Sequence, residues 1–227
     1  MAHEHTVKAF DEDITRLRGL IAEMGGLAEV ALQEGMDALV RGATDLAEQV
    51  VARDKRIDAL EAEVDRLAIR IIALRAPMAD DLREVIAGLK IAGVLERIGD
   101  YAKNIARRTG QIEARKTFEP LTLIPAMAEL AGEMVHDVLT AFAARDPQMA
   151  AEIVARDEKV DAFYNSIFRN LVSHMMENPS SISTAAQLLF VARNIERIGD
   201  HATNVAEMVY YAATGDYLTE REDATEI

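Results

Sequence analysis

The pentapeptide Glu-Arg-Ile-Gly-Asp occurs twice in this chain, at residues 96–100 and again at residues 196–200. The residues on either side of it also align without a gap, and an earlier tetrapeptide, Val-Ala-Arg-Asp, recurs at residues 51–54 and 154–157. A repeated unit of about 100 residues is too long, and two copies are too few, for a solenoid. The duplication fits two copies of a three-helix bundle.

Apolar residues recur at helical spacing through most of the chain, and no stretch shows the sustained alternation of a half-buried strand. Proline, glycine and capping residues divide this pattern into six predicted helices. The helices of the first half span about residues 11–40, 44–74 and 80–108. Those of the second half end near residues 145, 177 and 213, and Asp146-Pro147 starts the middle one. We therefore predict an all-α protein whose repeats span residues 1–112 and 113–227.

The composition limits the chemistry that this chain can support. It contains 25 Lys and Arg against 39 Asp and Glu, a net charge of −14, and it has no Cys. The absence of Cys excludes a disulfide framework, thiolate metal ligation and a cysteine nucleophile. The acidic balance argues against a nucleic-acid partner, because phosphate contacts need clustered Lys and Arg. No signal peptide is visible, and no apolar stretch reaches the roughly 20 residues of a spanning helix. We therefore expect a cytoplasmic protein without direct membrane insertion.

Each copy of the pentapeptide begins a row of oxygen-bearing side chains. Residues four apart on a helix lie along one stripe, and like charges at this spacing destabilise the helix by a few tenths of a kcal/mol. Two such stripes are predicted, one in each half: Glu96, Asp100 and Asn104, and Glu196, Asp200 and Asn204. Carboxylate and amide oxygens suit Mg²⁺, Ca²⁺, Mn²⁺ or an iron ion. A bound divalent or iron-type metal ion would compensate for the repulsion between the acids.

The helix before each stripe adds further acids, but the two halves differ. In the first half, Asp58, Glu61 and Asp65 follow one another at helical spacing. The second half keeps Asp161, while Tyr164 stands where Glu61 aligns and a Phe stands where Asp65 aligns. If metal ions bind, the halves need not bind them equally.

A second interpretation of the stripes requires no metal. Arg97 precedes Asp100 by three residues, and Arg193 precedes Glu196 by three. At that spacing each arginine can form a surface ion pair with its acid, worth under about 1 kcal/mol. The repeated spacing would then reflect duplication alone, with a solvated or ion-paired helix face.

Gly99 and Gly199 stand at the same place in the two copies of the motif. Glycine inside a helix costs about 1 kcal/mol relative to alanine. Its recurrence indicates a close approach between helices or access to the backbone, and we favour close packing.

Motifs that would indicate catalysis are missing from the sequence. We find no P-loop, dinucleotide fingerprint or His-Glu-x-x-His, and no Gly-x-Ser-x-Gly. The paired Glu-x-x-His of di-iron carboxylate bundles is also missing. A binding or regulatory function is therefore favoured over an enzymatic one.

At the two Glu-Arg-Ile-Gly-Asp segments, the sequence resembles the PhoU family of phosphate-specific transport system accessory proteins. The likeness covers nearly the whole chain and includes the tandem pentapeptides. Further matching segments are His5-Thr-x-x-x-Phe10-Asp11, Ile72-Ala-Leu-Arg-Ala-Pro77 with Asp81-Leu-Arg83, and Arg193-x-Ile-Glu-Arg-Ile-Gly-Asp200. The resemblance implies two tandem antiparallel three-helix bundles related by internal pseudosymmetry.

The resemblance also implies a function and partners. The family suggests a non-enzymatic, cytoplasmic, negative regulator of high-affinity phosphate uptake and of the phosphate starvation response. Its implied partners are the ATPase of a phosphate ABC transporter and the sensor histidine kinase of the phosphate two-component system, which it would connect as an adaptor. A homodimer is also expected. Some relatives bind metal clusters, which implies metal ligation by Glu96, Asp100, Glu196 and Asp200, with Asn104 and Asn204 beside them.

Other functions stay open on the sequence alone. The main alternative is a carboxylate-rich helical metalloprotein with a metal-dependent role of its own. A purely structural helical spacer is a further alternative. Direct phosphate sensing, with Arg97 and Arg197 as contributors, is a weaker one because the chain lacks a glycine-rich nest or a basic pocket.

Overall fold

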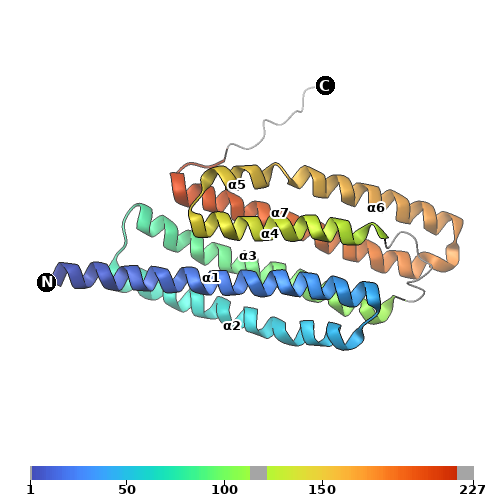
Figure 1. The fold of residues 1–227 in the computed structure, drawn as a ribbon, viewed down its shortest axis with the longest axis horizontal. Helices are drawn as coiled ribbons and strands as arrows, with labels where there is room; N and C mark the ends of the chain where they lie inside the picture. Colours follow the sequence, from blue (N-terminus) through green and yellow to red (C-terminus); the bar gives the residue numbers. More distant parts are fainter. Residues whose placement is uncertain (1, 113–121, 219–227) are drawn as a thin grey trace, which may run out of the picture.

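Two bundles of long helices lie side by side in the computed structural model of the chain (Figure 1), which describes residues 2–112 and 122–218. The first bundle contains α1 (Ala2–Arg41), α2 (Thr44–Arg75) and α3 (Asp80–Arg107). The second contains α4 (Ile124–Ala144), α5 (Pro147–Val154), α6 (Asp157–Glu177) and α7 (Ile182–Thr214). Two 3-10 helices, η1 (Thr109–Gln111) and η4 (Pro179–Ser181), complete the described elements.

The described residues contain no strand, and α5 and α6 together form the middle arm of the second bundle. The predicted all-α fold of two tandem antiparallel three-helix bundles is therefore confirmed. The predicted boundary between the repeats meets residues 113–121, which lie outside the described part of the chain. Within the described ranges, no helix has the length and hydropathy that a bilayer crossing requires.

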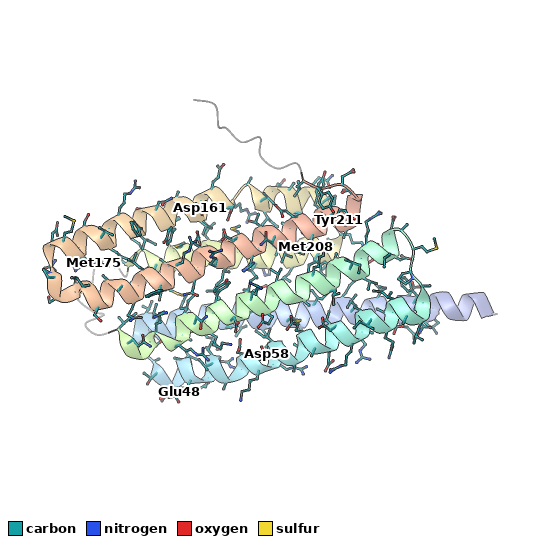
Figure 2. The ribbon with its side chains drawn as sticks, turned by 180° about the vertical axis from the view of Figure 1, so that it is seen from behind. Glu48, Asp58, Asp161, Met175, Met208 and Tyr211 are labelled. Atoms are coloured by element: carbon teal, nitrogen blue, oxygen red, sulfur yellow. The ribbon has the colours of Figure 1, made fainter. Side chains whose placement is uncertain are left out.

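The repeated motifs lie on α3 and α7, which pack against each other at the centre of the molecule. Figure 2 shows these helices between α2 and α6, so that four helices follow one another across this face. The apolar residues of the motifs are fully buried: Leu95, Ile98, Ala102 and Ile105 on α3, and Ile195, Ile198, Ala202 and Val205 on α7. Burying a Leu or Ile side chain contributes about 1.5–3 kcal/mol. This apolar face fixes the rotation of both helices and therefore the direction of the acidic stripes beside it.

Two helix boundaries differ from the prediction. The first helix extends to Ala2 instead of starting near residue 11, since no Pro or Gly interrupts the preceding residues. The helix predicted over residues 147–177 is divided by a turn at Ala155 and Arg156. Two hydrogen bonds between residues three apart close the turn. The Arg156 N–H donates to Ile153 O and the Lys159 N–H donates to Arg156 O, both at 2.9 Å. The Arg156 side chain pairs with Asp137 on α4, a tertiary contact that the helical pattern does not reveal.

The start of α5 agrees with the sequence. Asp146 is its N-cap, and the Asp146 carboxylate accepts hydrogen bonds from the backbone N–H groups of Gln148 and Met149 at 3.0 and 3.1 Å. Such a cap satisfies donors that the first turn leaves without helical partners.

Candidate metal centre

Gly99 and Gly199 lie where each motif helix packs tightly against its neighbour. A Cβ atom on Gly99 would lie 2.7 Å from Ile57 Cδ1 of α2, and one on Gly199 would lie 3.2 Å from Val160 Cγ1 of α6. Both distances are shorter than ordinary van der Waals contact. The glycines therefore allow close packing, as the sequence indicated.

The two glycine contacts also define equivalent positions in the two halves. Asp54 Oδ1 lies 3.5 Å from the Cβ position of Gly99, and Asp157 Oδ1 lies 3.5 Å from that of Gly199. Helix α2 therefore meets α3 in the same register in which α6 meets α7. This register lets each residue of one acidic stripe be compared with its counterpart in the other.

In the second half, three carboxylates converge between α6 and α7. One carboxylate oxygen from each of Asp161, Glu196 and Asp200 lies within 4.8 Å of the other two. No other set of three acids or histidines among the described side chains, in residues 8–112 and 122–218, is this compact. Asp161 is exposed on α6, as Figure 2 shows, whereas Glu196 is only 8% exposed. The group is therefore open to solvent on the α6 side and buried on the α7 side.

Glu196 has one oxygen with a partner and one without. Arg193 donates a hydrogen bond to Glu196 Oε1, which confirms the predicted arginine–acid pair, and the Arg193 guanidinium lies 5.6 Å from the Tyr164 ring centroid. Glu196 Oε2 is buried and has no hydrogen-bond partner. Leaving a buried acceptor without a partner costs about 1–3 kcal/mol, and more for a charged group. A cation at this oxygen would remove that cost.

The surroundings of Glu196 make its ionised form less stable than in water. Burial raises the pKa of Glu196 above its ordinary value, and the neighbouring Asp200 raises that pKa further. Arg193 and Arg197 oppose the rise, and Arg197 Nη1 lies 3.8 Å from Asp200 Oδ2. The raised pKa reflects the cost of holding an ionised carboxylate in a buried place beside a second acid.

In the first half, the predicted ligands gather more loosely. Burial raises the pKa of Glu96, and Asp100, Glu61 and Asp58 raise it further in that order. Burial likewise raises the pKa of Glu61, followed by the charges of Asp65 and Asp58. These acids therefore lie near one another, although they do not form a compact three-carboxylate group like that of the second half.

A lysine binds two of the first-half acids. The Lys103 ammonium donates to Asp54 Oδ2 at 2.5 Å and also to Asp100 Oδ1. Asp100 therefore pairs with Lys103 instead of with Arg97, the partner that the sequence suggested. Lys103 lies outside the predicted ligand set, although the aligned motifs differ at this position, with Lys103 in one and Thr203 in the other.

The two predicted asparagine ligands contact residues of their own helices. Asn104 Oδ1 lies 3.5 Å from Arg107 Nη1, and Asn204 Nδ2 lies 3.4 Å from His201 Nδ1. Metal ligation by Asn104 and Asn204 stays a prediction.

The PhoU domain model matches this chain twice, over residues 21–109 and 124–209. A phosphate-specific transport system accessory protein PhoU homolog from Zymomonas mobilis is 55% identical over 217 residues, covering 96% of this chain and 92% of the relative. A homolog of the same description from Caulobacter vibrioides is 44% identical, covering 99% of this chain and 98% of the relative.

Two solved structures have the same fold. The crystal structure of PhoU from Pseudomonas aeruginosa superposes with a TM-score of 0.87 at 35% identity, covering 91% of this chain and all of that one. The phosphate transport system regulatory protein PhoU from Streptococcus pneumoniae superposes with a TM-score of 0.86 at 26% identity, covering 92% of this chain and 99% of that one.

Proposed function

This chain belongs to the PhoU family, and from that membership we propose that it is an accessory protein that regulates phosphate transport. The observation that carries the proposal is the 55% identity to an accessory protein of the phosphate-specific transport system over nearly the whole chain. The two repeats, residues 1–112 and 113–227, would act together without catalysing a reaction. The protein would work in the cytoplasm as a negative regulator of phosphate uptake and of the phosphate starvation response.

The proposed mechanism is adaptor binding. The partners would be the ATPase of a phosphate ABC transporter and a sensor histidine kinase. If this chain binds one state of the transporter or kinase more tightly than another, it shifts the population toward that state. The net charge of −14 favours basic partner surfaces, because complementary charge steers association and selects partners. A homodimer would present two copies of such a surface.

We propose further that Asp161, Glu196 and Asp200 bind a divalent or iron-type metal ion. Support comes from the convergence of the three carboxylates and from the partnerless buried oxygen of Glu196. The ion would supply positive charge that joins α6 to α7, and water would fill the remaining coordination positions on the exposed side. In the first half, Glu96, Asp100, Asp58 and Glu61 are the ligands that the sequence predicts, with Asn104 and Asn204 beside the two stripes.

A deletion strain tests the regulatory function. Deleting the gene is expected to raise expression from a phosphate-starvation promoter in phosphate-rich medium, and the full-length chain supplied in trans is expected to restore repression. Unchanged expression after deletion would contradict the proposal. Purified transporter ATPase and sensor kinase, each tested for direct binding to the chain, would identify which partner the adaptor contacts.

The alternative, a metalloprotein with its own metal-dependent role, is favoured by the same carboxylate group. It differs in what a ligand substitution should do. Under the alternative, Glu196→Gln abolishes the protein's effect together with its bound metal while leaving partner binding intact. Under the adaptor function, loss of the effect follows loss of partner binding.

A further inference from the structure

The duplicated motif places different residues at one equivalent position, Lys103 on α3 and Thr203 on α7. The equivalence is structural as well as sequential. Asp54 and Asp157 lie at the same distance, 3.5 Å, from the Cβ positions of Gly99 and Gly199, four residues before Lys103 and Thr203. The same helix contact therefore carries an ammonium group in one half and a hydroxyl group in the other.

In the first half, the ammonium group fills the space between two acids of different helices. Lys103 Nζ lies 2.5 Å from Asp54 Oδ2 on α2 and also binds Asp100 Oδ1 on α3. Asp54 is only 5% exposed, and the Lys103 side chain is 16% exposed. An ammonium group carries one positive charge and three donors, and here it joins the buried carboxylate of Asp54 on α2 to the partly exposed carboxylate of Asp100 on α3.

In the second half, the corresponding position supplies no charge. Thr203 Oγ1 and Glu196 Oε2 are both buried, and neither has a hydrogen-bond partner. The arginines close to this group lie on α7 itself, where Arg193 binds Glu196 and Arg197 approaches Asp200. Asp161, the contribution of α6 to the group, thus faces α7 without a tethered ammonium between the helices.

We propose that residues 103 and 203 decide which repeat binds a metal ion. The ammonium of Lys103 is a built-in cation that takes the place of a metal in the first repeat, whereas Thr203 leaves the second repeat open to one. This inference rests on the proposed metal centre and goes beyond it. A divalent ion bound to Asp100 would lie beside the ammonium and be repelled by it. At Asp200 the equivalent position carries the neutral hydroxyl of Thr203, and the neighbouring cation is Arg197 of the same helix, 3.8 Å from Asp200 Oδ2.

The position of Lys103 accounts for the less compact carboxylates of the first half, although that half has more acids. Asp100 binds Lys103, and the first-half carboxylates do not form a compact group of three. In the second half, the acid at the equivalent position, Asp200, converges with Glu196 and Asp161. The charge at a single helical position therefore distinguishes two otherwise duplicated sites.

Reciprocal exchange of the two residues tests the inference. Binding of Mn²⁺ to the metal-free full chain is measured by isothermal titration calorimetry, and bound ions are counted by electron paramagnetic resonance of the free Mn²⁺. Thr203→Lys is expected to weaken Mn²⁺ binding at least about tenfold, whereas the matched control Thr203→Val keeps wild-type affinity. Lys103→Thr is expected to add a second set of Mn²⁺ sites, which Glu96→Gln in the same chain removes, whereas Lys103→Arg adds none.

The outcomes separate this inference from the metal centre on which it rests. If Lys103→Thr remains helical by circular dichroism and gains no Mn²⁺ site, the inference is overturned, whatever the wild-type chain binds. If Thr203→Lys binds Mn²⁺ as the wild-type chain does, it is overturned independently of the Lys103 variant. If the wild-type chain binds no Mn²⁺ but Lys103→Thr does, the second-repeat centre fails while the role of Lys103 is supported.

Discussion

Tyr101 on α3 and His201 on α7 stack on each other, with ring centroids 5.5 Å apart and ring planes 21° apart. They occupy equivalent positions in the two copies of the motif. Burial lowers the pKa of His201, and the nearby charge of Arg97 lowers it further, which favours the neutral ring. The stack places the two motifs face to face across the contact between the bundles.

Alanine substitutions at two glycines are expected to have opposite effects on stability. Gly19 has no atom within 4 Å of its Cβ position, so Gly19→Ala should stabilise the protein by about 0.5–1 kcal/mol through helix propensity. Gly99→Ala gains the same propensity but forces Ile57 out of a buried position, so a net loss of about 1 kcal/mol is expected. Urea unfolding of both variants measures the difference. Equal stabilisation by both would refute the close-packing role of Gly99.

The ion pair between Lys103 and Asp54 should contribute strongly in metal-free protein. Lys103→Met leaves the buried carboxylate of Asp54 without its cation, at an expected cost of about 3 kcal/mol. Asp54→Asn in the Lys103→Met chain removes that charge and should recover part of the loss. Chemical unfolding in the presence of a chelator measures the coupling between the two substitutions. A coupling near zero would show that the pair is not formed in solution.

Glu84 is expected to connect the two bundles. Glu84 lies on α3 and is only 6% exposed, and its carboxylate binds Arg18 of α1 together with Arg145, which follows α4. Glu84→Gln weakens both ion pairs and should cost about 2–3 kcal/mol. The matched control is Asp80→Asn, because the Asp80 side chain is 82% exposed and its pair with Arg83 is worth under about 1 kcal/mol. Similar losses of unfolding free energy in both variants would contradict this role of Glu84.

Asp13 should make part of the stability depend on pH. Burial alone would raise the pKa of Asp13, but hydrogen bonds from Arg70 and Arg75 outweigh it and hold that pKa below the ordinary 3.8. A lowered pKa in the folded state means that the stabilisation is present above about pH 4 and is lost as the pH falls through the folded value. Asp13→Asn should therefore cost about 2 kcal/mol at pH 6 and progressively less below pH 4.

The check on Asp13 is a pair of urea unfolding series between pH 6 and pH 3. The quantity of interest is the difference in unfolding free energy between the wild-type and Asp13→Asn chains, because other carboxylates titrate in both. A difference that stays constant over this range would show that Asp13 is not ion-paired in the folded state.

Much of the fold follows from the sequence because helical periodicity and duplication are both local patterns. The division between α5 and α6 does not. Residues 51–54 and 154–157 have the same sequence, yet the first copy continues α2 and the second contains the turn. Identical tetrapeptides cannot encode that difference locally. Tertiary contacts such as the pair between Arg156 and Asp137 accompany it.

The candidate site shows the same limit. Stripe spacing correctly indicates that Glu196 and Asp200 share a helix face with Asp161 opposite them, and the structure brings the three together. The number of acids predicts a metal site in the first half as well, where Asp58 and Glu61 add to the stripe. The difference between the halves depends on the Lys103 ammonium, which extends across a helix contact to Asp54. Helical spacing alone does not reveal such a contact between helices.

Anomalous diffraction from crystals of the full chain grown with Mn²⁺ tests the central claim most directly. Data collected above and below the manganese absorption edge locate bound ions without reference to activity. A manganese peak is expected among the carboxylates of Asp161, Glu196 and Asp200, and none is expected beside Asp100, where the Lys103 ammonium lies. A peak beside Asp100, or no peak between α6 and α7 at saturating Mn²⁺, would contradict it.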